Sequence, residues 1–307
     1  MPDTTNPNDA VLVAAVAAKD AKAAKAALAA GASANAVTAK KRPVLLEALE
    51  LKSKTLSKLL LDAGADVNAA DAKQVTPLHV ICTTFPDLDL AAALLKAGAN
   101  PNVLASDDQS PLHHAILRPK LDLAGVLLDN GADINIRDGY RGETPLQLTI
   151  RTNTKTSRIA MEWLLNRGAD ANAQDNNTDN AVATAIYHAD NDTTLIDMLL
   201  KFGGKPATNK HGDTPLHRAV DCNHNRGAVW AFAFDHNPAD INAQCSNKRT
   251  PLHAAISRGN VPAIKFLVAN GADLSLRCDR GKSALDAAKN MRQGEAVVAL
   301  LEAAGAV

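Results

Sequence analysis

The sequence has little aromatic character and no excess of charge of either sign. Phenylalanine, tryptophan and tyrosine together make up 3% of its 307 residues, so a core must be built mainly from alanine and leucine, which suits helices that approach closely in thin layers. Lysine plus arginine number 33, and so do aspartate plus glutamate. No global field therefore draws the protein onto nucleic acid or an anionic membrane. We expect neither nucleic acid nor membrane among its partners.

Cysteine is scarce, and its spacing excludes the common cysteine frameworks. Cys82, Cys222, Cys245 and Cys278 form no Cys-x-x-Cys pair, which argues against a zinc knuckle or a disulfide scaffold and favours a reducing compartment. The apolar stretch 10–18 is short and follows acidic residues instead of lysine or arginine, so it fails as a signal peptide or a membrane span. We expect a cytoplasmic protein, and delivery into a host cell stays open.

What the sequence does contain is a block that recurs about every 34 residues. Its Gly-Ala-x endings begin at Gly31, Gly64, Gly98, Gly131, Gly168, Gly203 and Gly271, with a degenerate copy at Pro238 and a last one at Gly305. A Thr-Pro-Leu-His motif, or a relative of it, runs in step and begins at Arg42, Thr76, Ser110, Thr144, Asn180, Thr214, Thr250 and Ser283. Two motifs that stay in phase over most of the chain predict an array of stacked repeats.

The repeat that begins at Thr76 shows how one block is expected to fold. The Thr76 hydroxyl can cap a helix, and Pro77 suits the first helical position because no intrahelical partner awaits its missing N–H. The imidazole of His79 is placed to tie back to Thr76, which makes it structural. Gly98 can take the left-handed conformation that closes the second helix, and Asn100 suits the turn after it.

The combined pattern D-x-x-G-x-T-P-L-H-x-A, followed by L-L-x-x-G-A-D-x-N, resembles the ankyrin repeat over roughly residues 8–305, in about nine units. The resemblance implies an all-α solenoid of stacked helix-turn-helix units with turn or hairpin tips. We expect a single domain over residues 1–307, with an N-terminal capping unit at 8–36, internal repeats at 37–282 and a C-terminal capping unit at 283–307.

Three segments depart from the pattern. The motif at Asn180 lacks the proline and the histidine. At Pro238 a proline replaces the closing glycine, and we expect Asn237 to supply the left-handed residue instead. The polar run 151–158 is expected to form a protruding loop between two helices.

In the family's pattern, the positions four, three and one before the threonine, and seven and eight after it, are exposed and variable. Solenoids bind through the surface made of such tips and inner-helix positions. In a chain so poor in aromatics, tyrosine and arginine there match the residue types of binding hot spots. The predicted partner-binding residues are Tyr140, Arg141, Arg151, Tyr187, His188, Lys210, His211 and Arg258.

Other interpretations of these aromatic residues stay open. Tyr140 could decorate a turn, and Tyr187 could fill the gap left by the missing motif. Trp163 and Trp230 are expected in the core.

These features favour a non-catalytic module, without cofactor and monomeric before binding, that holds another protein as an adaptor or scaffold. One alternative is a stoichiometric inhibitor or immunity-type protein that covers a partner enzyme. A more remote one is a zinc-dependent enzyme whose ligands would come from Cys222, His224, Cys245 and His253.

Overall fold

The computed structural model describes residues 6–189, 191–221, 226–291 and 294–306, and the chain divides into two compact units, residues 1–149 and 150–307. Helices α1 to α18 form nine consecutive pairs, as the motif spacing predicts, and the predicted all-α solenoid is confirmed. Among the described residues, the β-structure amounts to one isolated bridge between Val37 and Pro43. The assignment of the whole chain to a single domain stays a prediction.

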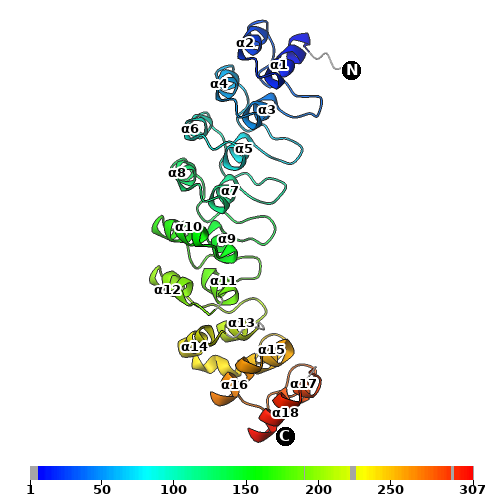
Figure 1. The fold of residues 1–307 in the computed structure, drawn as a ribbon, viewed down its shortest axis with the longest axis vertical. Helices are drawn as coiled ribbons and strands as arrows, with labels where there is room; N and C mark the ends of the chain where they lie inside the picture. Colours follow the sequence, from blue (N-terminus) through cyan, green and yellow to red (C-terminus); the bar gives the residue numbers. More distant parts are fainter. Residues whose placement is uncertain (1–5, 190, 222–225, 292–293, 307) are drawn as a thin grey trace. The chain divides into compact units, whose positions relative to one another are not determined.

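In the first unit, each odd-numbered helix lies in an inner row beside the loops, and each even-numbered helix lies on the side of that row away from the loops (Figure 1). Helix α5 packs against its own partner α6 and against α3 and α7 of the neighbouring pairs. The inner helices are α1 (Pro7–Ala17), α3 (Val44–Glu50), α5 (Pro77–Thr83), α7 (Pro111–Leu117) and α9 (Pro145–Thr152), which contains the boundary between the units, and the outer helices are α2 (Ala21–Ala29), α4 (Lys54–Asp62), α6 (Leu88–Lys96) and α8 (Leu121–Asp129).

The second unit repeats this arrangement. Helix α15 packs against α16 and against the inner helices α13 and α17. The inner helices are α11 (Ala181–His188), α13 (Pro215–Val220), α15 (Pro251–Arg258) and α17 (Ala284–Lys289), and the outer helices are α10 (Lys155–Asn166), α12 (Thr194–Lys201), α14 (Gly227–His236), α16 (Val261–Ala269) and α18 (Glu295–Ala303). A short 3-10 helix, η1 (Pro238–Asn242), follows α14.

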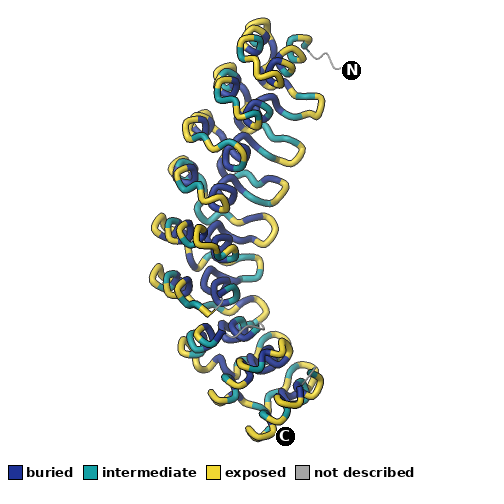
Figure 2. The backbone as a smooth tube through the Cα atoms, viewed as in Figure 1, coloured by how far each residue is buried: buried dark blue, intermediate teal, exposed yellow. Residues whose placement is uncertain are grey.

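Within each unit, the inner helices form the most buried layer (Figure 2). Leu78 of α5 is 1% exposed and Leu252 of α15 is fully buried, so both leucines of the motif belong to the core. The loop tips and the solvent side of the outer helices carry most of the exposed positions.

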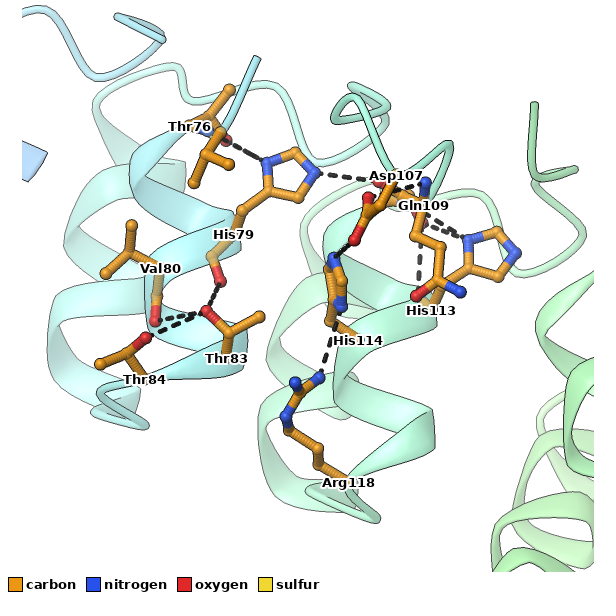
Figure 3. Close-up of polar contacts among 12 residues, drawn as sticks. Thr76, His79, Val80, Thr83, Thr84, Asp107, Gln109, His113, His114 and Arg118 are labelled. Carbon is orange, nitrogen blue, oxygen red and sulfur yellow. Dashed lines mark hydrogen bonds and ion pairs between the residues drawn. The ribbon is translucent and has the colours of Figure 1, made fainter. Parts of the chain in front are cut away.

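The histidine of the motif connects neighbouring repeats (Figure 3). The Nδ1 atom of His79 accepts a hydrogen bond from the Thr76 amide at 3.2 Å and lies 2.8 Å from the Thr76 hydroxyl. Because Nδ1 accepts, the ring proton is on Nε2, which donates to the carbonyl oxygen of Gln109 in the next repeat at 3.1 Å. The structural role predicted for this histidine is confirmed. The same bond recurs from His113 to Glu143, from His217 to Arg249 and from His253 to Lys282.

Asn180 takes over two polar roles of its motif, the helix cap of the threonine and the inter-repeat bond of the histidine. Its Oδ1 accepts from the Ala183 amide at 3.0 Å and so caps α11, as threonine does elsewhere. Its Nδ2 donates to the carbonyl oxygen of Lys205 at 2.7 Å, which takes the place of the histidine bond to the next repeat.

Gly98 closes α6 with a φ of 93°, as predicted, but the expectation for Asn237 was wrong. Asn237 has a φ of −150°, which is extended backbone, and α14 ends because the chain turns into η1 at Pro238. The Asn237 side chain holds that turn by donating to Asp240 at 2.7 Å.

The protruding loop expected over residues 151–158 was also wrong. Helix α9 continues to Thr152, and α10 begins at Lys155, so only two residues separate the helices. Thr154 starts α10 with a capping box, in which its hydroxyl accepts from the Ser157 amide at 3.1 Å. A strong cap thus turns a polar segment into the first turn of a long helix.

Asp and Asn side chains hold the turns at the tips, as predicted for Asn100, and also link repeats. The Asn68 amide donates to Asp66 Oδ1 at 2.8 Å within its own turn. The Asn68 side chain then donates to the carbonyl oxygen of Gly98 and accepts from the amide of Asn100, one repeat further on. Asparagine in this position joins successive turns within the first unit.

Candidate functional site

Helices α9, α11 and α15 are buried at their starts and open to solvent at their C-terminal ends. In α15, residues 251–256 are buried whereas Ser257 and Arg258 are exposed. In α11, residues 181–186 are buried whereas Tyr187 and His188 are half-buried. Every predicted partner-binding residue lies at such a helix end or on a loop tip and retains some exposure; their role in binding stays a prediction.

Tyr140 and Arg141 lie on a tip of the first unit. The Tyr140 side chain is 74% exposed, and the Arg141 guanidinium carbon lies 5.8 Å from the centre of its ring. The tip is held by the buried carboxylate of Asp138, which accepts hydrogen bonds from the amides of Arg141, Gly142 and Glu143. A large aromatic side chain is therefore presented to solvent on a well-defined backbone.

Tyr187, in the second unit, lies beneath an arginine. The Arg218 guanidinium carbon is 4.6 Å from the centre of the Tyr187 ring, within the range of a cation–π interaction. His188 meets the same ring edge-on, with the centres 5.1 Å apart. Because Asn180 supplies the missing polar groups of the motif, Tyr187 does not replace them.

The same Arg218 forms an ion pair with Asp179, with Nη2 and Oδ2 2.7 Å apart. Burial raises the pKa of the Asp179 carboxyl, and the positive charge of Arg218 opposes that rise. Tyr187 is also fixed through its backbone, because its carbonyl oxygen accepts from Nη1 of the buried Arg226 at 2.7 Å. Asp179, Tyr187, Arg218 and Arg226 therefore form one network across α11, α13 and the start of α14.

Arg218 was missed in the sequence, although a signal existed. It stands four residues after the first residue of its motif, where the other motifs place Leu46, Val80, His114, Leu148, Thr184, Ala254 and Ala287. An arginine at a position that, apart from His114, is apolar or small indicates a partner nearby. His114 gives the same signal in α7, where it contacts Asp107 and Arg118 (Figure 3).

A cavity of about 470 Å³ lies among α13, α15 and the tips before them. Two of the predicted binding residues, His211 and Arg258, line it, and the exposed Lys210 precedes His211 in the chain. Arg258 pairs with Asp221 through two hydrogen bonds of 2.7 and 3.0 Å. Arg218 and Arg249 also line the cavity. Arg151 belongs to α9 and does not line this cavity.

Two of the four candidate zinc ligands, Cys245 and His253, belong to the described residues. Cys222 and His224 lie outside the described residues. His253 uses Nδ1 for Thr250 and Nε2 for Lys282, and Cys245 donates to Asn247 at 2.8 Å. Within the described part of the chain, no group of three His, Cys, Asp or Glu side chains is placed to hold a metal ion.

The two tryptophans differ. Trp230 is 3% exposed and donates from its indole nitrogen to the carbonyl oxygen of Ala219, as expected of a core residue. The expectation that Trp163 is buried was wrong: it is half-buried, and Arg167 lies 4.9 Å above its ring. Trp163 lies between the buried side and the solvent side of α10, and Arg167, one turn further along the chain, covers its ring.

Comparison with known families agrees with this architecture. Models of ankyrin repeats match residues 73–106, 94–148, 154–231 and 234–288. The chain belongs to the ankyrin-repeat family. Ankyrin repeats are generally non-enzymatic and serve as protein–protein interaction modules.

Curated relatives share this region but are longer. The chain is 27% identical over 230 residues to an E3 ubiquitin-protein ligase, KEG, of Arabidopsis thaliana, covering 69% of this chain and 14% of the ligase. It is 29% identical over 175 residues to transient receptor potential cation channel subfamily A member 1 of Homo sapiens, covering 54% of this chain and 15% of the channel. The B-cell lymphoma 3 protein homolog of Mus musculus is 28% identical over 222 residues, which cover 71% of this chain and 40% of the homolog. The ankyrin chain thus spans less than half of each relative. None of its described helices is long and apolar enough to cross a membrane.

Proposed function

We propose that this ankyrin-repeat chain is an adaptor that holds a partner protein on the surface formed by its loop tips and the C-terminal ends of its inner helices. The observation that carries the proposal is the contrast within those helices. The first turns of α9, α11 and α15 are buried, whereas the ends of these helices expose or half-expose Arg151, Tyr187 and Arg258, and a loop tip exposes Tyr140. Tyrosine and arginine, fixed on a rigid backbone, are the residue types that dominate binding energy at protein interfaces.

The reactive side chains that can be described support a non-catalytic role. The histidines of the capping boxes use both ring nitrogens for contacts within the stack, so they are not available as general bases. Burial raises the pKa of the Cys82 thiol to about 12, so it is not a nucleophilic thiolate near neutral pH. We take the chain to be monomeric before it binds, which sedimentation of the purified protein tests directly.

The proposal is tested by affinity capture from the native cell with mass spectrometry. One variant changes the first unit, Tyr140→Ala with Arg141→Ala, and another changes the second, Lys210→Ala with His211→Ala. A control variant, Glu162→Ala with Lys265→Ala, alters two exposed positions of outer helices. We expect proteins captured by the wild type and the control to be lost from a tip variant that keeps its melting temperature.

The same experiment separates an adaptor from an inhibitor. Loss of several proteins supports the adaptor. Loss of a single enzyme, whose activity falls when the purified chain is added, supports the inhibitor. An identical protein set for the wild type and both tip variants would overturn the proposed surface.

A further inference from the structure

The cavity of the second unit has more positive than negative charge around it. Its lining carries three arginines, Arg218, Arg249 and Arg258, against two aspartates, Asp213 and Asp221. Two exposed lysines, Lys210 and Lys248, adjoin lining residues in the chain. Even when the buried Asp179 behind Arg218 is included, cations outnumber carboxylates.

The charges of the lining are not all matched. Arg218 pairs with Asp179, and Arg258 pairs with Asp221. Asp213 is held by the side-chain amide of Asn209 at 3.1 Å. Arg249 differs from the other two arginines, because its Nη2 donates to two neutral oxygens, the His253 carbonyl at 3.1 Å and the Ser257 hydroxyl.

Arg249 therefore retains donors for a ligand. A guanidinium has five N–H donors in one plane, and within the described residues the Nε and Nη1 groups of Arg249 make no hydrogen bond. Its two anchoring bonds fix the plane, so the remaining donors are oriented in advance. Nε–H and Nη1–H point to different edges of the group, so each is available to donate a charge-assisted hydrogen bond to a carboxylate oxygen.

The surroundings favour one negative charge over two. Asp221 follows the last residue of α13, and Arg258 is the last residue of α15, so the cavity lies at the C-terminal ends of two inner helices. Helix C-termini carry partial negative charge, and among the described arginines of the lining Arg249 alone has no carboxylate partner, so one unmatched cation faces one carboxylate. At about 470 Å³ the cavity is also within the size range of sites that enclose a ligand group.

We propose that this cavity receives an aspartate or glutamate side chain of the bound protein and that Arg249 pairs with its carboxylate. The inference rests on the proposed function, since it names the chemistry of the partner at one part of the proposed surface. His211, Ser246 and Asn247 form the adjoining polar wall, from which the peptide backbone around the acidic residue is contacted.

The test uses the full chain and a phage-displayed library of random dodecapeptides. We expect the peptides selected by the wild type to share an acidic residue. Affinity of the best synthetic peptide should fall about tenfold or more when its acidic residue is changed to the matching amide, and by a similar factor with Arg249→Gln. Arg280→Gln, which removes the same charge from an exposed tip outside the cavity, is the matched control and should bind as the wild type does.

A second variant covers the case in which Arg249→Gln loses stability. Asn247→Asp keeps the size of a side chain in the cavity wall and adds one negative charge, so it should also weaken the acidic peptide. Selection of basic or apolar peptides, or of none, would overturn the inference. So would tighter binding when phosphoserine replaces the acidic residue, because the ligand class would then be phosphate.

Failure of this inference is distinct from failure of the proposed function. Acidic peptides that bind through Arg249, together with native capture that is unchanged by the tip variants, would support the cavity and overturn the adaptor surface. Native partners that are lost from the tip variants but captured equally by the wild type and Arg249→Gln would support the adaptor surface and overturn the cavity inference.

Discussion

The Arg218 guanidinium carbon lies 4.6 Å from the centre of the Tyr187 ring, while the same group forms an ion pair with the nearly buried Asp179. One arginine thus covers an aromatic side chain of the proposed binding surface and neutralises a carboxylate beneath it. Tyr187 is consequently part of both the surface and the stack, and the network makes separate predictions for its members.

Tyr187→Ala should lower the free energy of unfolding by about 1–2 kcal/mol, because it removes a partly desolvated cation–π contact. Tyr187→Phe keeps the ring and should change it by less than about 0.5 kcal/mol. Urea titrations of both variants measure the difference. Equal losses in the two variants would show that the hydroxyl, and not the ring, carries the contribution.

Arg218→Met should cost more, about 3–5 kcal/mol, because the Asp179 carboxylate is only 4% exposed and would lose its guanidinium partner. Adding Asp179→Asn should recover part of the loss, since the carboxylate charge is then gone. A double-mutant cycle from thermal or urea unfolding checks this. Strictly additive losses would contradict the coupling.

Leu252→Ala should destabilise the stack by about 2–5 kcal/mol, because the leucine is fully buried and its removal leaves a cavity. Leu88→Ala is the matched control. Leu88 is 44% exposed, so its truncation should cost less than about 1 kcal/mol. Comparable melting temperatures for the two variants would contradict the placement of Leu252 in the core.

Stability should fall in mild acid. Burial is the main cause that lowers the pKa of His79, His113, His217 and His253 below the ordinary value of 6.5. Above about pH 6.5 these side chains are neutral in the folded and the unfolded chain and add no pH dependence. Below it the unfolded chain binds protons that the fold excludes, so each histidine lowers the free energy of unfolding by up to about 1.4 kcal/mol per pH unit until its folded-state pKa is reached.

One motif of the chain suggests a variant that isolates the contribution of a single histidine to this pH dependence. At the fourth motif, Gln147 replaces the histidine, and its Oε1 accepts from the Thr144 amide at 3.0 Å. His253→Gln should therefore retain the cap and reduce the loss of stability between pH 6.5 and 5. The exposed His211→Gln serves as the control. If His253→Gln loses as much stability between pH 6.5 and 5 as the wild type does, His253 is excluded as a source of the pH dependence.

The sequence allowed the helix pairs, their caps and the closing glycines to be predicted because each depends on residues a few positions apart. Thr76 and His79, for example, are three residues apart and meet within one helical turn. Contacts between repeats were harder to predict. The Arg218 contact with Asp179 spans 39 residues and has no local pattern. Its stacking on Tyr187 and the cavity near Arg249 likewise depend on how neighbouring repeats pack.

Errors arose where one polar residue could adopt two local structures. Thr154 could continue a loop or cap a helix, and the capping box decided for the helix. Asn237 could turn left-handed or extend, and Pro238 drew the chain into a 3-10 turn. In both cases a neighbouring residue supplied the deciding hydrogen bond or ring constraint.

The histidine bonds between repeats have sequence separations of only 29 to 32 residues. A nascent helix pair therefore finds its docking partner in the segment synthesised just before it. At about 5–20 residues per second, translation delivers the next repeat within several seconds, whereas local docking of low contact order is far faster. Each unit can consequently assemble during translation, and at each step only the apolar face of the last repeat synthesised awaits its neighbour.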